Sequence, residues 1–138
     1  MNAFVTARLM TAVIVLLAAV SAKQVAAQTA DQQQVSVREG VTVKVTARDL
    51  GASSEVWKFA IVLDTHSKEL GEDLVEAAVL VTDDGRRIKP LSWKGAPAGG
   101  HHREGTLEFK APTPTPKSLE LRLQRPGEPD PRVFRWTP

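Results

Sequence analysis

The sequence predicts an all-β fold: an immunoglobulin-like antiparallel β-sandwich of about seven strands, with a small closed barrel as the alternative. Three observations lead to this prediction. Apolar residues recur with a period of two, typical of strands, through most of the chain after residue 31. Clusters of glycine, proline and aspartate separate these runs at short intervals. The 138 residues include no cysteine, so apolar packing or a bound ion, and not disulfides, must stabilise the fold.

Residues 1–27 have the order of features of a secretory signal peptide. A short N-terminal segment with one positive charge precedes an apolar run over residues 9–20, and small residues follow that run. The apolar run is shorter than the roughly 20 residues that a membrane span needs. We therefore expect cleavage after Ala22 or Ala27, no membrane anchor afterwards, and a periplasmic or secreted product.

The rest of the chain is predicted to be one domain. Residues 28–34 are polar and form an expected disordered lead-in, and residues 35–138 form the β-sandwich. Cleavage after Ala27 removes Arg8 and Lys23, which reduces the 18 basic residues by two, to 16 against 16 acidic ones. Because the mature chain is then near neutral and has no basic stripe with interleaved aromatic residues, we expect no nucleic-acid partner.

The first predicted strands follow directly from alternation. Valines at every second position over residues 41–46 indicate a half-buried strand. Residues 35–37 have the same parity and are separated from that strand by Glu39-Gly40. Residues 56–63 are apolar on both faces, with Val56, Ala60 and Val62 opposite the larger side chains. This second pattern predicts a strand in the centre of a sheet.

The clearest hairpin signal lies in the middle of the chain. An apolar stretch over residues 74–82 precedes the turn sequence at residues 83–85, and residues 86–93 are expected to form the returning strand. Further strands are predicted over residues 107–109, 119–123 and 133–136. The proline-rich segments at residues 112–116 and 125–131 are predicted to be loops, because proline removes a backbone donor and restricts the preceding residue.

This topology brings the three histidines of the chain to one end of the domain. Short connections favour antiparallel neighbours, so the strand over residues 56–63 should end on the same side as the loop over residues 94–104. Loops on a rigid scaffold commonly carry function. The polar residues expected to meet at this rim are Asp64, His66, His101 and His102.

One interpretation of the rim is a transition-metal site. Imidazole nitrogens and a carboxylate suit zinc or copper ions. Asp64 and His66 are two apart on an extended chain, so their side chains share a face. His101 and His102 are adjacent and can bind one ion only if the backbone bends, which Gly99-Gly100 permits. The chain has no recognised ligand spacing such as H-E-x-x-H.

The other interpretation is that the rim residues provide loop structure or contact a partner. Histidines at strand ends commonly bond loop backbone or a carboxylate, and Arg103, whose charge Glu104 partly balances, could lock the rim through an ion pair. Three carboxylates are candidates for that pair: Asp64, Glu72 and Asp73. Trp93 could stack on a sugar or peptide if exposed, so Trp93, Arg103 and Glu104 are the candidate residues for rim structure or partner contact.

We expect no enzyme and no cofactor apart from the ion of the metal interpretation. Ser67 follows His66, but adjacency in sequence does not create a nucleophile and base pair, and no G-x-S-x-G motif occurs. The carboxylates of Glu69, Glu72 and Asp73 are expected to be solvated. A domain of this size also offers little cleft for a carboxylate pair to flank a glycoside.

Four segments in combination resemble a family of small exported bacterial and archaeal β-domains. They are W-K-F-A-I-V-L-D-T-H-S, P-L-S-W-K-G, G-G-H-H-R-E-G-T-L-E-F and R-V-F-R-W, and the resemblance extends from about Val41 to Trp136. That family has no assigned activity, so the resemblance implies no substrate or mechanism. It implies only that the D-T-H and G-G-H-H-R segments act as one feature.

Two functions therefore follow from the sequence. In the first, the chain is an exported, non-enzymatic binding module whose histidine-rich rim or exposed strand edge contacts a protein partner. In the alternative, it binds zinc or copper through Asp64, His66, His101 and His102.

Overall fold

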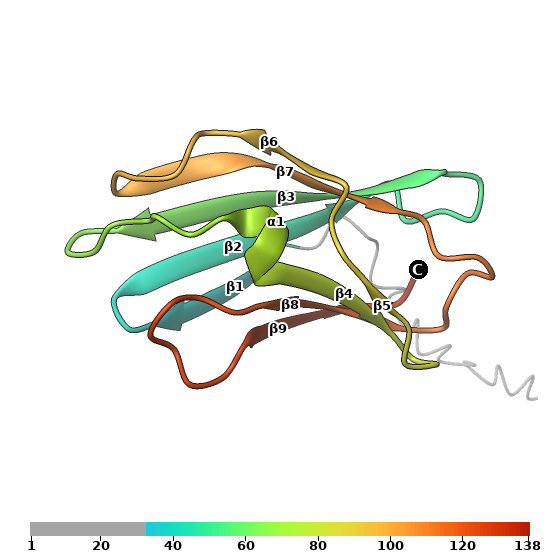
Figure 1. Ribbon diagram of the computed structural model, residues 1–138. Helices are drawn as coiled ribbons and strands as arrows, with labels where there is room; N and C mark the ends of the chain where they lie inside the picture. The colour runs from blue at the N-terminus through green and yellow to red at the C-terminus, as the bar shows by residue number, and fades with distance from the viewer. Residues whose placement is uncertain (1–32) are drawn as a thin grey trace, which may run out of the picture.

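The computed structural model describes residues 33–138, which form two antiparallel β-sheets packed face to face (Figure 1). The predicted signal peptide over residues 1–27 and the lead-in up to residue 32 lie outside the described residues. The nine strands of the described part are β1 (Gln33–Arg38), β2 (Val41–Arg48), β3 (Val56–Thr65), β4 (Ala78–Thr82), β5 (Arg87–Ile88), β6 (Ser92–Gly95), β7 (His102–Lys110), β8 (Leu119–Leu123) and β9 (Arg132–Trp136). A single helical turn, α1 (Leu74–Ala77), precedes β4.

Each sheet contains strands from separate parts of the chain, because the chain crosses between the two sheets three times. The five-stranded sheet has the order β1-β2-β3-β7-β6, and the four-stranded sheet has the order β5-β4-β8-β9. The chain changes sheet between β3 and β4, where α1 lies, and again between β5 and β6 and between β7 and β8 (Figure 1). The all-β, two-sheet architecture predicted from the period-two pattern is confirmed.

The core lies between the sheets and is formed by the inward-facing half of each alternation. The inward side chains of β2, β3 and β8 are all fully or almost fully buried, as are Phe134 and Trp136 of β9. Phe59 joins the two layers, because its ring contacts Phe109 of β7 edge-on at 5.5 Å and Trp136 at 5.2 Å. Burial of each such side chain contributes roughly 1.5 to 3 kcal/mol, so this cluster holds the sheets together.

The predicted hairpin exists but is shorter than the apolar pattern suggested. Leu80 pairs with Ile88 across the turn, and Gly85 adopts a φ of 85° while its N–H bonds the Thr82 carbonyl at 2.9 Å. The stretch predicted as one strand over residues 74–82 begins instead as α1. Asp73 caps that turn by accepting a hydrogen bond from the Val75 N–H at 2.9 Å.

The prediction of one returning strand over residues 86–93 is wrong. Those residues are divided between β5 in the four-stranded sheet and β6 in the five-stranded sheet. The buried Pro90 lies between them and cannot donate to a ladder, so the pairing stops there and the chain crosses to the other sheet. The division of one predicted strand into two adds a strand to the expected number. β1 begins at Gln33 and so includes the last two residues of the expected lead-in.

No helix within residues 33–138 has the length and apolar character needed to cross a membrane.

Candidate functional site

The candidate site is the rim, which we define as two segments. Residues 64–72 comprise the last two residues of β3 and the loop after it, and residues 96–104 comprise the loop after β6 and the first three residues of β7. The two segments are joined through their backbones. The Thr65 N–H donates to the His101 carbonyl at 2.9 Å, and Leu70 exchanges hydrogen bonds with the Gly99 N–H at 2.8 Å and the Gly100 carbonyl at 3.0 Å. Gly99 and Gly100 have positive φ values of 112° and 74°, which bend the chain into this position at no steric cost.

Asp64 and His102 are brought into direct contact by the strand register. They lie opposite each other on β3 and β7, at a position where the two residues exchange no backbone hydrogen bonds and side chains approach most closely. Nδ1 of His102 lies 2.5 Å from Oδ1 of Asp64. Its Nε2 lies 3.7 Å from Oε2 of Glu104, and 56% of the His102 side chain is exposed. The three side chains therefore form an exposed cluster on the outer face of the five-stranded sheet.

The carboxylates around His102 stabilise its protonated form. The hydrogen bond that the His102 ring donates to Asp64 is the main cause of a pKa raised above the ordinary 6.5, and the negative charges of Asp64 and Glu104 act in the same direction. Partial desolvation opposes them. The ring therefore keeps its positive charge to a higher pH than an ordinary histidine does.

His66 and His101 are exposed and lie beside this cluster along the chain. The structure brings Asp64 and His102 together, but within residues 33–138 it places no three histidine, cysteine or acidic side chains close enough to hold one metal ion. The backbone bond between Thr65 and His101 nevertheless keeps the two exposed histidines on neighbouring strand ends.

Arg103 fixes the shape of the rim in a way that the sequence did not predict. Its side chain is buried, with only 2% of the residue exposed, and its Nη1 donates to the carbonyl oxygens of Leu70 at 3.0 Å and Glu72 at 2.7 Å. The expected ion pair with Asp64, Glu72 or Asp73 does not form, because the loop folds its backbone carbonyls, and not a carboxylate, toward the guanidinium. A guanidinium carries five N–H donors, so this one side chain can bond several backbone carbonyls of the loop at once.

Trp93 is partly buried against the edge of the core beside the rim. Its Nε1 donates to the Ala96 carbonyl at 2.8 Å, and the Arg103 guanidinium lies 5.7 Å from its ring centre, within the range of a cation–π contact. Gly95 and Gly105 face each other beneath the ring, where an added Cβ on Gly105 would lie 2.5 Å from the Gly95 Cα. Trp93 therefore stabilises the rim and does not present its ring as an open stacking surface.

A second polar cluster, which sequence reasoning missed, is buried behind the rim. Glu72 bonds Arg125 at 2.5 Å, and Glu128 accepts from both Arg125 and Arg132. Arg132 also donates to three carbonyl oxygens on β1 and β2, those of Ser36, Arg38 and Val41. The expectation that Glu72 is solvated is wrong. Glu128 pairs with arginines only three and four residues away, but that spacing is also compatible with a solvated proline-rich loop. The groups that bury the cluster, Glu72 and the carbonyls of β1 and β2, come from distant segments.

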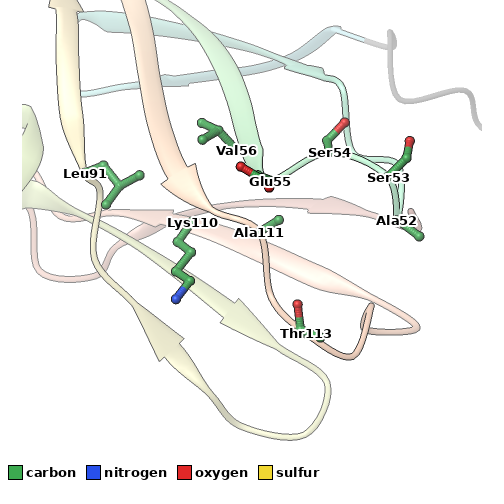
Figure 2. A pocket seen from close by; sticks show the side chains of 9 residues that line it. All are labelled: Ala52, Ser53, Ser54, Glu55, Val56, Leu91, Lys110, Ala111 and Thr113. Atoms are coloured by element: carbon green, nitrogen blue, oxygen red, sulfur yellow. The ribbon is translucent and has the colours of Figure 1, made fainter.

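The other end of the sandwich carries an open hollow of about 440 Å³ (Figure 2). Its wall consists mostly of small or apolar side chains from residues 52–56, Leu91 and the end of β7, with Glu55 and Lys110 as the charged groups. Because β3 runs from Val56 at the hollow to Thr65 at the rim, the two features lie at opposite ends, and no rim residue lines the hollow.

Comparison of the chain with protein-family models, with curated proteins and with solved structures finds no match.

Proposed function

We propose that the protein is an exported, non-enzymatic β-sandwich module that binds a protein partner through the rim. The observation that carries this proposal is that neighbouring residues of β7 have different roles, because their side chains point to opposite faces of the sheet. Arg103 and the backbone bonds of residues 99–101 hold the rim from inside. His102 and Glu104 point outward and are not needed for that shape. A rigid surface whose exposed polar groups have no structural task is suited to recognition.

The charges of the cluster indicate what a partner would present. Asp64 and Glu104 carry two negative charges beside one imidazole, so a basic side chain on the partner would complement them. Both ring nitrogens of His102 are directed at carboxylates. The imidazole therefore has no hydroxyl to activate, which supports a binding role over a catalytic one.

We also infer an immunoglobulin-like connectivity. The order β2-β3-β7-β6 corresponds to the A, B, E and D strands of that fold, and β4, β8 and β9 to its C, F and G strands. In this assignment β5 takes the place of C′, and β1 is an additional edge strand. Folds of this kind commonly present their recognition residues on loops at one end, as the rim does.

Site-specific photo-cross-linking in the producing cells tests the proposal. A photoreactive residue replaces His66 in the rim or, as the matched control, Ser53 at the opposite end of the sandwich. We expect a discrete protein adduct from the rim position alone, and we expect Glu104→Lys to reduce it at least several-fold while leaving the melting temperature unchanged. Equal adducts from both positions, or none, would contradict a rim-mediated interaction.

A second candidate function is zinc or copper binding by Asp64, His66, His101 and His102. It is favoured by the contact between Asp64 and His102 and by the backbone bond that keeps His66 and His101 on neighbouring strand ends. Calorimetric titration with each metal should then show binding that His102→Ala and His66→Ala abolish, together with a metal-dependent rise in melting temperature. Absence of both effects would exclude this candidate.

A further inference from the structure

The four edge strands of the described part are protected to different degrees. An edge strand presents unpaired N–H and C=O groups that can pair with another chain, and proteins usually blunt such edges. β5 has two residues and is followed closely by Pro90, and β6 has four residues, including Lys94, with Pro97 soon after. In β9, the backbone of Arg135 is occupied by the side-chain amide of Gln34, which donates to its carbonyl at 2.5 Å and accepts from its N–H at 3.0 Å.

β1 is less protected than these strands, since its one charged residue, Arg38, is the last residue of the strand and donates to the Asp130 carbonyl. It is six residues long and lies at the edge of the five-stranded sheet, on the side next to β9 (Figure 1). The segment from Gln33 to Val37 contains no proline, glycine or charged residue. Val35 is 55% exposed and Val37 is 71% exposed. The free edge is therefore long, uncharged and partly apolar.

The turn between β1 and β2 determines which backbone groups are free. Glu39 and Gly40 have positive φ values of 51° and 73°, as in a two-residue type I′ turn, which makes Arg38 and Val41 a hydrogen-bonded pair. Since hydrogen-bonded and open positions alternate along an antiparallel ladder, Gln33, Val35 and Val37 direct their N–H and C=O groups away from β2. Within residues 33–138 no side chain bonds these groups.

We propose that β1 pairs in antiparallel orientation with β1 of a second copy of this chain, around a twofold axis at Val35. In this register Val35 lies opposite Val35 of the other copy, and Gln33 lies opposite Val37. Each of these pairs can exchange two backbone hydrogen bonds, because the three residues are the ones whose polar groups point outward. The two five-stranded sheets then form one continuous sheet.

A second copy fits this edge because the pairing is self-complementary. A twofold interface places the same patch on both subunits, and the uncharged segment brings no like charges into opposition. Valine opposite valine is a favourable cross-strand pair. The inference concerns a surface other than the rim and does not depend on the proposed partner binding there.

Single cysteines in this cysteine-free chain test the register. Directly opposed residues in a hydrogen-bonded pair have Cα atoms about 5.5 Å apart, within the range of a disulfide. We expect Val35→Cys to give a disulfide-linked dimer on mild oxidation. The matched control Val37→Cys lies on the same strand and is more exposed, but its two copies would be four residues out of register, roughly 13 Å apart, and it should remain monomeric. Equal cross-linking of both variants would overturn the register.

Sedimentation of the purified wild-type protein and of Val35→Pro tests the dimer itself. The proline removes only an outward-facing N–H, so the ladder to β2 and the melting temperature should be preserved while the dimer is lost. A wild-type protein that stays monomeric up to about 1 mM, where even a dimer with a dissociation constant of about 1 mM would be populated, would overturn the proposal. So would a Val35→Pro variant that dimerises as the wild type does.

Discussion

Nδ1 of His102 lies 2.5 Å from Oδ1 of Asp64 across two neighbouring strands, while the next residue along β7, Arg103, points to the opposite face and is buried. Because successive side chains of a strand point to opposite faces of the sheet, these two adjacent residues have different roles. The buried side chain determines the shape of the rim, and the exposed one determines its surface chemistry. Each task can be tested by changing one residue without the other.

The first prediction concerns the titration of His102. Its pKa is raised above 6.5, mainly by the hydrogen bond that the ring donates to Asp64. The small contribution of this exposed charged pair to stability is therefore full below pH 6.5 and is lost as the pH rises through the raised pKa. Asp64→Asn should bring the pKa of His102 back toward 6.5, and Glu104→Gln should lower it by a smaller amount. NMR titration of the imidazole signals measures both, and a larger effect from Glu104→Gln would contradict the geometry.

The second prediction concerns the buried arginine of the rim. Arg103→Met preserves bulk but leaves the carbonyl oxygens of Leu70 and Glu72 without their donor, so the free energy of unfolding should fall by about 3 kcal/mol. The matched control is His102→Ala, the neighbouring residue on the exposed face, which should alter unfolding very little. Urea denaturation compares the two variants. A stable Arg103→Met protein would show that the loop does not depend on the guanidinium.

The third prediction concerns the close approach of β6 and β7. In Gly105→Ala the new Cβ would lie 2.5 Å from the Gly95 Cα and 2.6 Å from the Lys94 carbonyl oxygen. Because both are backbone atoms, the strands must separate, at a cost of roughly 1 to 3 kcal/mol or more. Gly71→Ala is the control, since nothing lies within 4 Å of its added Cβ. Thermal unfolding should show a lower melting temperature for the first variant only.

The fourth prediction concerns stability in acid. Hydrogen bonds and charge from Arg132, and then from Arg125, hold the pKa of Glu128 below its usual 4.5. Its contribution is therefore present above about pH 4.5 and is lost as the pH falls through the lowered value. Glu128→Gln should reduce the free energy of unfolding by about 3 kcal/mol at pH 7, and the difference from wild type should narrow as the pH falls below 4.5. A gap that is constant with pH would contradict this account.

Much of the fold follows from local pattern. The alternation in residues 41–46, 56–63 and 119–123 predicted β2, β3 and β8, because which face of a strand is apolar is a property of the strand itself. The turn at residues 83–85 was predicted for the same reason, since glycine is needed where φ is positive. The division of residues 86–93 was not predicted, because the apolar residues on both sides of Pro90 fit either sheet equally well.

The candidate site was predicted only in part. The expectation that successive strands are antiparallel was enough to place Asp64 and the loop that carries His101 and His102 at the same end of the domain. The structure puts Asp64 opposite His102. The partner of Arg103 was predicted wrongly as a carboxylate. The sequence shows which acidic residues are expected at the same end of the domain as Arg103. It does not show which backbone carbonyls point inward once the loop has folded.

The sequence by itself determined the class of fold and the main core strands, because apolar period and turn chemistry are local properties of the chain. It also determined that two polar segments meet, because the hairpin between them returns the chain to the end of the domain where the first segment lies. Only the tertiary structure decided which charges are buried and with whom. Arg103 donates to loop carbonyls. Arg132 of β9 bonds Glu128 four residues away and also the carbonyls of β1 and β2, which are more than 90 residues away in the chain. Buried polar groups must find partners wherever the packing of the whole chain brings them, and no short stretch of sequence contains that information.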